Sequence, residues 1–154
     1  MAEKTYSGNE VQLVVFKLGR EEYGVSILQV QEIKRMTDIT RVPHTPDYIT
    51  GVINLRGSVL PVIDLKNRLN LPPQDHTDNT RIIIIKIDEI VLGMLVDAVS
   101  EVLAIDQTNI ESPDSVVGGI AANFISGVGK LDNRLLILLN LEMIIGVGQD
   151  TKAV

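Results

Sequence analysis

The sequence predicts an all-β fold with a few short helices, arranged as two similar small barrels. The first observation is an internal repeat, because residues 11–65 and 80–141 carry nearly the same order of apolar, glycine and turn positions. The second is composition: Val and Ile make up about a quarter of the 154 residues and aromatic residues only 3%, and β-branched side chains favour strands. The third is a series of short apolar runs joined by tight turns, which is typical of closed barrels that leave no strand edge exposed.

The repeat keeps its register over long stretches. Residues 17–25 align with 86–94 at a shift of 69 positions, and 49–55 align with 125–131 at a shift of 76. Glycines and turn residues coincide as well as apolar residues, and local backbone geometry dictates those positions. We therefore interpret the repeat as two equivalent subdomains rather than as a chance likeness between Val/Ile-rich segments.

Four hairpins and three short helices account for the pattern. The hairpin strands, each pair flanking a polar turn, are residues 11–18 with 23–26, 49–55 with 59–63, 81–87 with 90–96, and 125–131 with 135–139. Ser26 and Gln29 form a capping-box pair ahead of apolar residues at helical spacing, which predicts two helical turns over 27–35. The N-cap residues Asp64 and Asn140 predict the other two helices, over 65–69 and 141–145.

The repeat also sets the domain boundaries. We predict one domain over residues 10–146, with the first barrel copy at about 11–70, the second at 80–146, and crossing of terminal strands between them allowed. Two units of this size are each marginal alone and gain stability by sharing a wall. The polar ends, 1–9 and 148–154, are expected to be flexible tails.

Charge and composition exclude several classes of function. The net charge of −6 makes nucleic acids and anionic lipid surfaces unfavourable partners. Cysteine is absent, which excludes disulfides and thiol chemistry. The N-terminus lacks the apolar stretch of a secretory signal, and no apolar segment is long enough to span a bilayer. We therefore expect a soluble cytoplasmic protein with no direct membrane insertion.

The residue types that carry chemistry do not form a recognisable catalytic or metal site. His44 and His76 lie in proline-containing loops without a second ligand at metal-binding spacing. Residues 127–130 resemble a phosphate-binding loop but lack its first glycine and its Ser or Thr. The carboxylate pair at 21–22 falls in a predicted turn, where both side chains are expected to be solvated. We predict no enzymatic activity and no cofactor or metal.

The two copies differ at one hairpin tip. The first copy reads Arg56-Gly57-Ser58 where the second reads Asp132-Asn133-Arg134. An arginine at the position of Arg56 either solvates the turn or serves as a bidentate anchor for a carboxylate of a partner. Both interpretations are compatible with the sequence.

Seven segments occur in the order and spacing of a known protein family. They are residues 22–25, 27–33, 41–43, 51–57 (Gly-Val-Ile-Asn-Leu-Arg-Gly) and 60–65 in the first copy, and 91–99 and 125–129 in the second. With them the sequence resembles the CheW family of bacterial chemotaxis coupling proteins. The resemblance extends over about residues 10–146.

The resemblance implies both a fold and a function. The fold is a pair of pseudo-repeated five-stranded SH3-like β-barrels packed on a shared hydrophobic core. The function is that of an adaptor without catalysis, which joins the cytoplasmic tip of methyl-accepting chemoreceptors to the regulatory domain of the histidine kinase CheA. Kinase and coupling domains then alternate in rings, so a protein that is monomeric alone is recruited to receptor arrays at the inner face of the cell membrane.

The resemblance also suggests which residues bind partners. Val30, Glu32, Arg56 and Gly57 match family positions associated with receptor or kinase contact. A receptor tip is a helical hairpin, so we expect it to lie in an apolar groove between the barrels, lined in part by Val96. The full set of predicted partner-binding residues is Ile27, Val30, Glu32, Ile33, Arg56, Gly57 and Val96.

Alternatives remain at the level of residues and of function. Val30 is also a candidate for ordinary core burial and Glu32 for a solvated helix face, and a glutamate at the matching position 101 argues against a special role for Glu32. A small-ligand-binding or catalytic β-barrel with a cavity between the barrels is one alternative function. Another is a regulatory module of a different two-component system, although a start at Met1 and a polar end favour a stand-alone protein.

Overall fold

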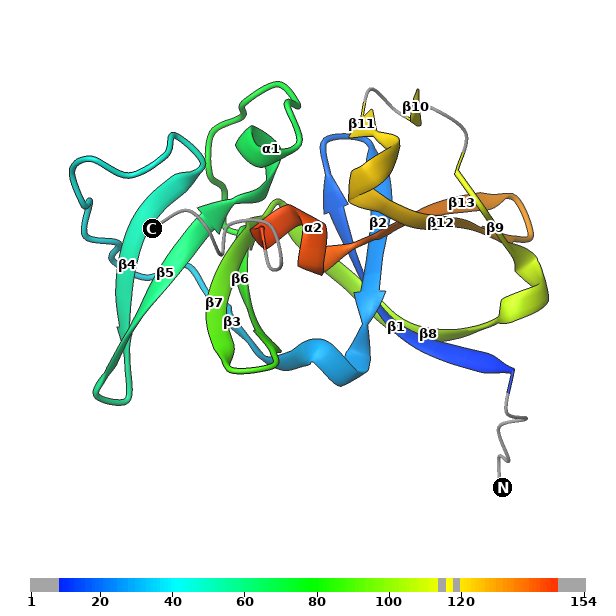
Figure 1. Ribbon diagram of the computed structural model, residues 1–154, viewed down its shortest axis with the longest axis horizontal. Coiled ribbons are helices and arrows are strands. Elements are labelled where there is room, and N and C mark those ends of the chain that lie inside the picture. The colour runs from blue at the N-terminus through cyan, green and yellow to red at the C-terminus, as the bar shows by residue number, and fades with distance from the viewer. Residues whose placement is uncertain (1–8, 114–115, 118–119, 147–154) are drawn as a thin grey trace.

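The computed structural model describes residues 9–113, 116–117 and 120–146, and most of these lie in two β-sheets (Figure 1). The six-stranded sheet has the order β8 (Ala98–Asp106), β1 (Glu10–Leu18), β2 (Glu21–Ser26), β13 (Arg134–Leu139), β12 (Ile125–Leu131) and β9 (Ile110–Glu111). The five-stranded sheet has the order β3 (Val30–Arg35), β6 (Arg81–Ile87), β7 (Ile90–Val96), β5 (Ser58–Asp64) and β4 (Ile49–Leu55). A small separate hairpin consists of β10 (Val116–Val117) and β11 (Ile120–Ala121). Short helical segments are η1 (Ile27–Gln29), α1 (Leu65–Arg68), η2 (Gln107–Asn109), η3 (Ala122–Phe124) and α2 (Leu141–Ile145).

Each sheet combines strands from both copies of the repeat. The first hairpin of copy one, β1 and β2, lies in the six-stranded sheet beside β13, and the first hairpin of copy two, β6 and β7, lies in the five-stranded sheet beside β5. The same parallel pairing holds each exchanged hairpin: Gly24 lies opposite Leu138, and its counterpart Gly93 lies opposite Val62. Figure 1 shows the result as two curled sheets standing side by side.

The predicted boundaries are altered by this exchange. The division into 11–70 and 80–146 does not follow the sheets, because the crossing of terminal strands moves one hairpin of each copy into the other barrel. The predicted tails, 1–9 and 148–154, lie outside the described residues apart from Asn9.

Both sheets close into SH3-like barrels, which confirms the predicted fold class. In the five-stranded sheet, Thr40 and Val52 exchange two backbone hydrogen bonds of 2.9 and 2.8 Å and so connect β4 to the segment that follows β3. In the six-stranded sheet, β12 pairs with the two-residue strand β9 at the corresponding place. A β-bulge recurs at matching positions too, at Gln31 and Ser100 in the third strand of each copy.

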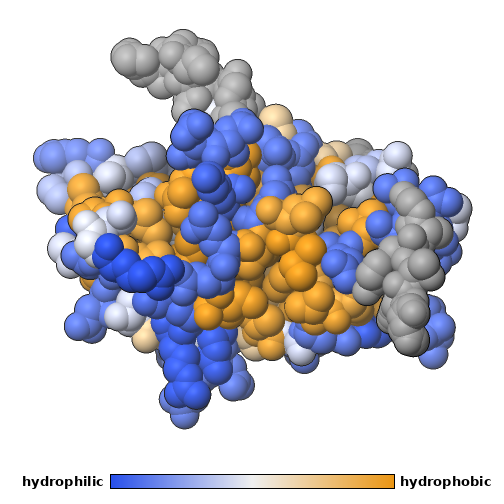
Figure 2. All heavy atoms as spheres, turned by 90° about the horizontal axis from the view of Figure 1, so that it is seen from below, coloured by the Kyte–Doolittle hydropathy of each residue, from blue (hydrophilic) through white to orange (hydrophobic). Residues whose placement is uncertain are grey.

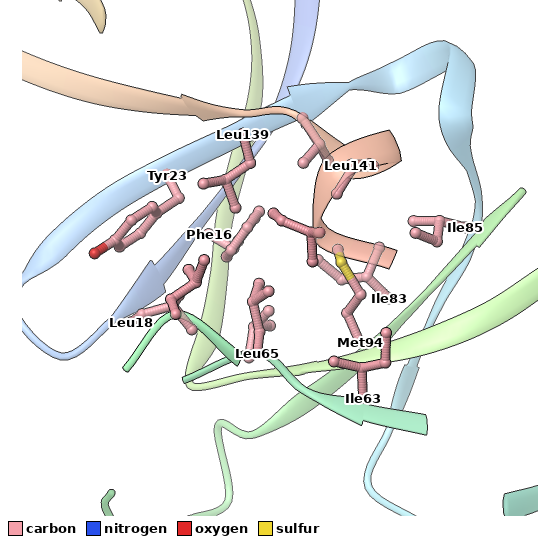
Figure 3. Close-up of a cluster of buried hydrophobic side chains, with 14 of the residues drawn as sticks. Phe16, Leu18, Tyr23, Ile63, Leu65, Ile83, Ile85, Met94, Leu139 and Leu141 are labelled. Atoms are coloured by element: carbon pink, nitrogen blue, oxygen red, sulfur yellow. The ribbon is translucent and has the colours of Figure 1, made fainter. Parts of the chain in front are cut away.

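Three apolar clusters fill the molecule. Ile82 and Ile84 of β6 point into the five-stranded barrel, and Leu13 and Val15 of β1 point into the six-stranded barrel. The alternate residues of the same strands face a shared core between the sheets (Figure 3). A strand that is buried on both faces has apolar residues at consecutive positions, which explains the four consecutive isoleucines of β6. The residues labelled in Figure 3 come from both barrels: Phe16, Leu18, Tyr23, Ile63, Leu65, Ile83, Ile85, Met94, Leu139 and Leu141.

The predicted helix over 27–35 is wrong. Only η1 is helical: it is a single 3-10 turn in which the hydroxyl of Ser26 accepts from the N–H of Leu28, and the chain continues as strand β3. Apolar residues three apart fit a helix, but β3 instead pairs with β6, whose backbone groups supply its hydrogen bonds from more than 40 residues away. The other two predicted helices are confirmed, with Asp64 and Asn140 as their N-caps.

Candidate partner-binding surface

Barrel closure brings Arg56 and Glu32 together at one end of the molecule. Arg56 and Gly57 form the two-residue turn between β4 and β5, both with positive φ (52° and 88°), and the N–H of Gly57 donates to Oδ1 of Asn54 at 3.1 Å. Nη2 of Arg56 donates to Oε2 of Glu32 on β3, at the opposite edge of the sheet. The Arg56 side chain nevertheless stays 72% exposed, so most of its donor groups remain open to a partner.

Two exposed apolar side chains are close in sequence to this ion pair. Ile33 follows Glu32 on β3 and Val59 stands near the start of β5, and both are exposed. Val59 was not among the predicted residues, although strand alternation indicates it: Leu60 and Val62 face the barrel interior, so Val59 faces out. We call Glu32, Ile33, Arg56, Gly57 and Val59 the five-stranded tip.

The six-stranded barrel carries a related but different arrangement. Nε and Nη2 of Arg134 donate to the two carboxylate oxygens of Glu22 at 3.0 and 3.1 Å, and Nη2 also donates to Glu101 at 2.7 Å. These hydrogen bonds, first with Glu22 and then with Glu101, raise the pKa of the Arg134 guanidinium above its usual range. Glu22 therefore lies on strand β2 in an ion pair, and the prediction of a solvated turn carboxylate is wrong for it.

A second surface of apolar character surrounds η1. Leu28 is 91% exposed, and shallow hollows beside it are lined by residues that include Val11, Leu13 and Leu138. The segment between β2 and β3 is at the lower edge of Figure 1 and therefore faces the viewer in Figure 2, where apolar atoms occupy the middle of this side. We call this area the η1 surface.

The predicted groove residues divide between this surface and the interior. Ile27 and Val30 are half-buried and pack against the shared core beside the η1 surface. Val96 is only 1% exposed and lies within the shared core. It is therefore not available to line a groove, because the alternation of β7 turns it inward.

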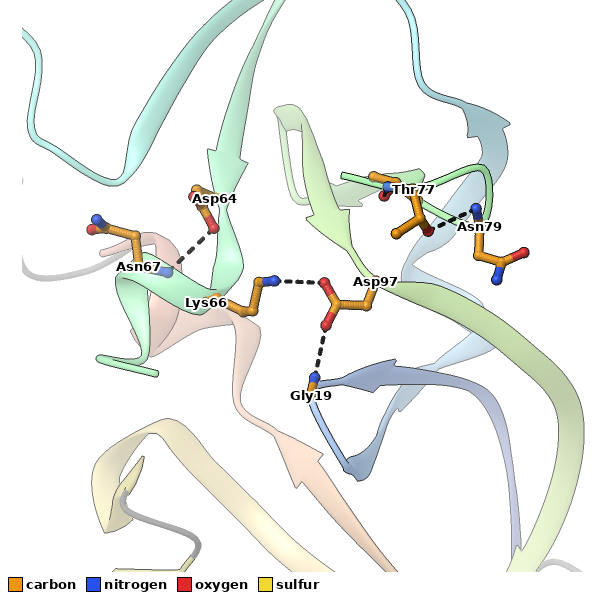
Figure 4. Close-up of polar contacts among 8 residues, drawn as sticks. Gly19, Asp64, Lys66, Asn67, Thr77, Asn79 and Asp97 are labelled. Atoms are coloured by element: carbon orange, nitrogen blue, oxygen red, sulfur yellow. Dashed lines mark hydrogen bonds and ion pairs between the residues drawn. The ribbon is translucent and has the colours of Figure 1, made fainter. Parts of the chain in front are cut away.

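Polar contacts fix the two barrels relative to each other (Figure 4). Asp97, where the chain passes from β7 to β8, accepts from Nζ of Lys66 and from the N–H of Gly19, both at 2.7 Å. These partners come from α1 and from the β1–β2 turn, so one carboxylate bridges both barrels.

Arg68 makes a second bridge. Its Nε donates to the carbonyl of Ile144 at 2.6 Å, and its guanidinium lies 4.6 and 4.9 Å from the ring centroids of Tyr48 and Phe124. The residue therefore connects α1 to α2 and η3, and such cation–π contacts strengthen with desolvation.

Within the described ranges, no group of three or more His, Asp or Glu side chains is arranged to hold a metal ion. No helix in that part of the chain has the length and apolar character needed to cross a membrane.

Comparisons with known proteins identify the family. A family model described as a CheW-like domain matches residues 12–148. The chain is 40% identical to the chemotaxis protein CheW of Bacillus subtilis, over 93% of this chain and 92% of that protein. It is 38% identical to a probable chemotaxis protein CheW of Rhizobium etli, over 92% and 91% of the two chains.

A solved structure agrees with these relatives. The scaffolding protein TtCheW of Thermoanaerobacter tengcongensis superimposes with a TM-score of 0.84 at 40% identity, covering 90% of this chain and 94% of that one. A likeness of this extent in sequence and in fold does not favour the alternative of a small-ligand-binding barrel. The chain belongs to the CheW-like family and is a chemotaxis adaptor protein.

Proposed function

We propose that the protein couples the cytoplasmic tip of a chemoreceptor to the regulatory domain of the histidine kinase CheA, by binding each at a separate surface. The observation that carries the proposal is the five-stranded tip, which combines an exposed guanidinium with exposed apolar side chains on β3 and β5. The protein acts in this scheme as a binding protein without catalysis, as expected of its scaffold family. By binding receptors, it is recruited to receptor arrays at the inner face of the membrane.

The five-stranded tip suits a folded partner domain that offers a carboxylate. Arg56 keeps free N–H donors after binding Glu32, and an arginine can bind a second carboxylate in a planar geometry. Ile33 and Val59 supply the apolar area that a protein interface needs around such a contact. We assign this end to the kinase regulatory domain.

The η1 surface suits a helical partner. Its exposed residue Leu28 and its apolar hollows offer contacts for the apolar stripe of a helix, in the manner of a helix laid into a groove. We assign this surface to the helical hairpin at the receptor tip.

The contacts between the barrels connect the two assignments. Asp97 and Arg68 hold the five-stranded tip and the η1 surface in one relative position. A receptor whose contacts with the η1 surface differ between its signalling states can then bias the kinase, and by linkage the kinase biases the receptor to the same extent. Weak individual contacts become effective in an array because neighbouring sites raise the effective concentration.

The test separates the two surfaces with two substitutions. Arg56→Glu is expected to weaken binding of an isolated kinase regulatory domain at least tenfold in calorimetric titration and to leave receptor-tip binding nearly unchanged, in a protein whose melting curve shows that it is folded. Leu28→Glu is expected to do the reverse. Arg20→Glu, an exposed arginine in another hairpin turn, is the matched control and should change neither. Equal binding of both partners by wild type and Arg56→Glu would remove the five-stranded tip from the proposal.

A further inference from the structure

The two ends of the molecule are built on one plan. Glu32 and Glu101 occupy matching positions on the third strand of each copy, and each pairs with an arginine of the hairpin tip. The apolar neighbours match as well: Ile33 corresponds to Val102 and Val59 to Leu135, and all four are exposed. We call Glu101, Val102, Arg134 and Leu135 the six-stranded tip. In apolar character alone, it offers the same kind of surface as the five-stranded tip.

The ends differ in what the arginine already binds. Arg134 uses Nε and Nη2 on Glu22 and Glu101, and its side chain is 35% exposed against 72% for Arg56. Glu22 is the added partner, because the matching residue in the five-stranded barrel is Val91. A further carboxylate, Asp132, stands where the other tip has Arg56.

We propose that Glu22 is a specificity-determining residue: it occupies Arg134, so that only Arg56 is open to a carboxylate of the partner. The charges at the two tips support this assignment. One guanidinium meets one carboxylate at the five-stranded tip, whereas Arg134 meets two and has Asp132 nearby. An incoming carboxylate is therefore attracted at one end and repelled at the other, and like-charge repulsion discriminates strongly between otherwise similar faces.

This assignment rests on the proposed function, because it takes the five-stranded tip as the kinase-binding end. It explains how a molecule with two similar ends binds a pseudo-symmetric partner in one orientation. A heterologous contact of this kind, between unlike ends, is also what permits alternation with a partner around a ring.

A first experiment needs no partner. The full-length protein is treated with phenylglyoxal, and the modification of each arginine is followed by mass spectrometry. In the wild type, Arg56 should react several-fold faster than Arg134. In Glu22→Val, which installs the residue of the matching position, and in the milder Glu22→Gln, the rate at Arg134 should rise about threefold or more while Arg56 is unchanged. Glu21→Val, an exposed neighbour, is the control, and an unchanged Arg134 rate in both Glu22 variants overturns the proposal.

A second experiment uses the kinase regulatory domain. Glu22→Val and Asp132→Asn are added to the Arg56→Glu protein, and asparagine suits the left-handed backbone at 132 (φ 54°). Binding lost through Arg56→Glu should recover at least tenfold in the triple variant, with a folded melting curve as the check. Absence of recovery overturns the inference about Glu22. Undiminished binding in Arg56→Glu alone refutes instead the proposed function, and the phenylglyoxal result then decides the role of Glu22 separately.

Discussion

The two barrels follow the same plan but close by different means. The six-stranded barrel closes with a strand, β9, whereas the five-stranded barrel closes with the single bridge between Thr40 and Val52. A glycine stands at the closing point of each, Gly51 in one and Gly127 in the other. At Gly51 the backbone of Thr40 approaches so closely that no side chain fits, whereas Gly127 is approached mainly by the side chain of Ile110. Equivalent positions therefore carry unequal constraints when one neighbour is backbone and the other is a movable side chain.

The largest expected effect comes from placing alanine at these two positions. A Cβ at Gly51 would lie 2.2 Å from the carbonyl oxygen of Thr40, and a Cβ at Gly127 would lie 2.7 Å from Cγ2 of Ile110. We expect Gly51→Ala to reduce the free energy of unfolding by about 3 kcal/mol or more and Gly127→Ala by only about 1–2 kcal/mol, because a side chain can move and a closing backbone bridge cannot. Urea unfolding measures both. Equal losses would show that the two closures are equally constrained.

The chain passes from one barrel to the other at two matching places, after β2 and after β7, and these places differ in their polar contacts. Asp97 stands at the crossing from β7 to β8, and the matching position at the crossing from β2 to β3 is the exposed Leu28. Asp97→Asn is expected to reduce stability by about 1–3 kcal/mol, because it leaves the nearly buried ammonium of Lys66 without its counter-charge. Leu28→Asn should change the urea midpoint very little.

A double variant tests the physical reason for that loss. Adding Lys66→Met to Asp97→Asn removes the stranded charge, so part of the lost stability should return. If the double variant is less stable than Asp97→Asn alone, the ammonium is stabilised by something other than Asp97 and the bridging role assigned to this carboxylate is wrong.

Local sequence signals predicted the hairpins, the caps and the repeat, but not the partners of distant strands. The turns at 56–57 and 132–133 and the N-caps are encoded within a few residues. The helix predicted over 27–35 failed because β6, which makes that segment a strand, comes much later in the chain. The sequence was compatible with an exchange of the first hairpins between the two barrels but did not show that it occurs, because the exchanged and the unexchanged arrangements bury the same apolar residues.

The candidate site was predictable only in part, for the same reason. Arg56 and Glu32 were both singled out, yet their contact depends on closure between opposite edges of one sheet. The pair of Glu22 with Arg134 spans 112 positions and exists only because β2 crosses into the second barrel. The prediction for Val96 was wrong because the sequence pattern of a strand does not distinguish an apolar residue that faces a groove from one that faces the core.

A smaller effect is expected from the two tip arginines. Arg134→Met leaves the carboxylates of Glu22 and Glu101 close together without their cation, so the melting temperature should fall at pH 7. The fall should shrink in high salt, which screens the repulsion between the two carboxylates. Arg56→Met removes one exposed ion pair and should leave the melting temperature nearly unchanged. Equal falls for the two variants would contradict the difference between the tips.

The smallest change at neutral pH is expected at Tyr23, whose matching residue in the other barrel is Leu92. Tyr23 is fully buried, and within the described residues its hydroxyl has no hydrogen-bond partner. Tyr23→Phe should therefore keep the packing against Phe16 and raise stability slightly, by about 0.5–1 kcal/mol, since a buried unpaired hydroxyl is unfavourable. Tyr48→Phe, at a partly exposed ring, is the control.

The difference between wild type and Tyr23→Phe should widen in alkali. Burial, with a smaller contribution from Glu21, raises the pKa of Tyr23 from 10.0 to about 12. The unfolded chain then releases this proton near pH 10 while the folded protein retains it, so stability that is fully present below pH 10 is lost as the pH rises toward 12. The loss should reach at most about 2.7 kcal/mol, and Tyr23→Phe should escape it. Parallel pH profiles of the urea midpoint for the two proteins would show instead that the Tyr23 hydroxyl reaches solvent.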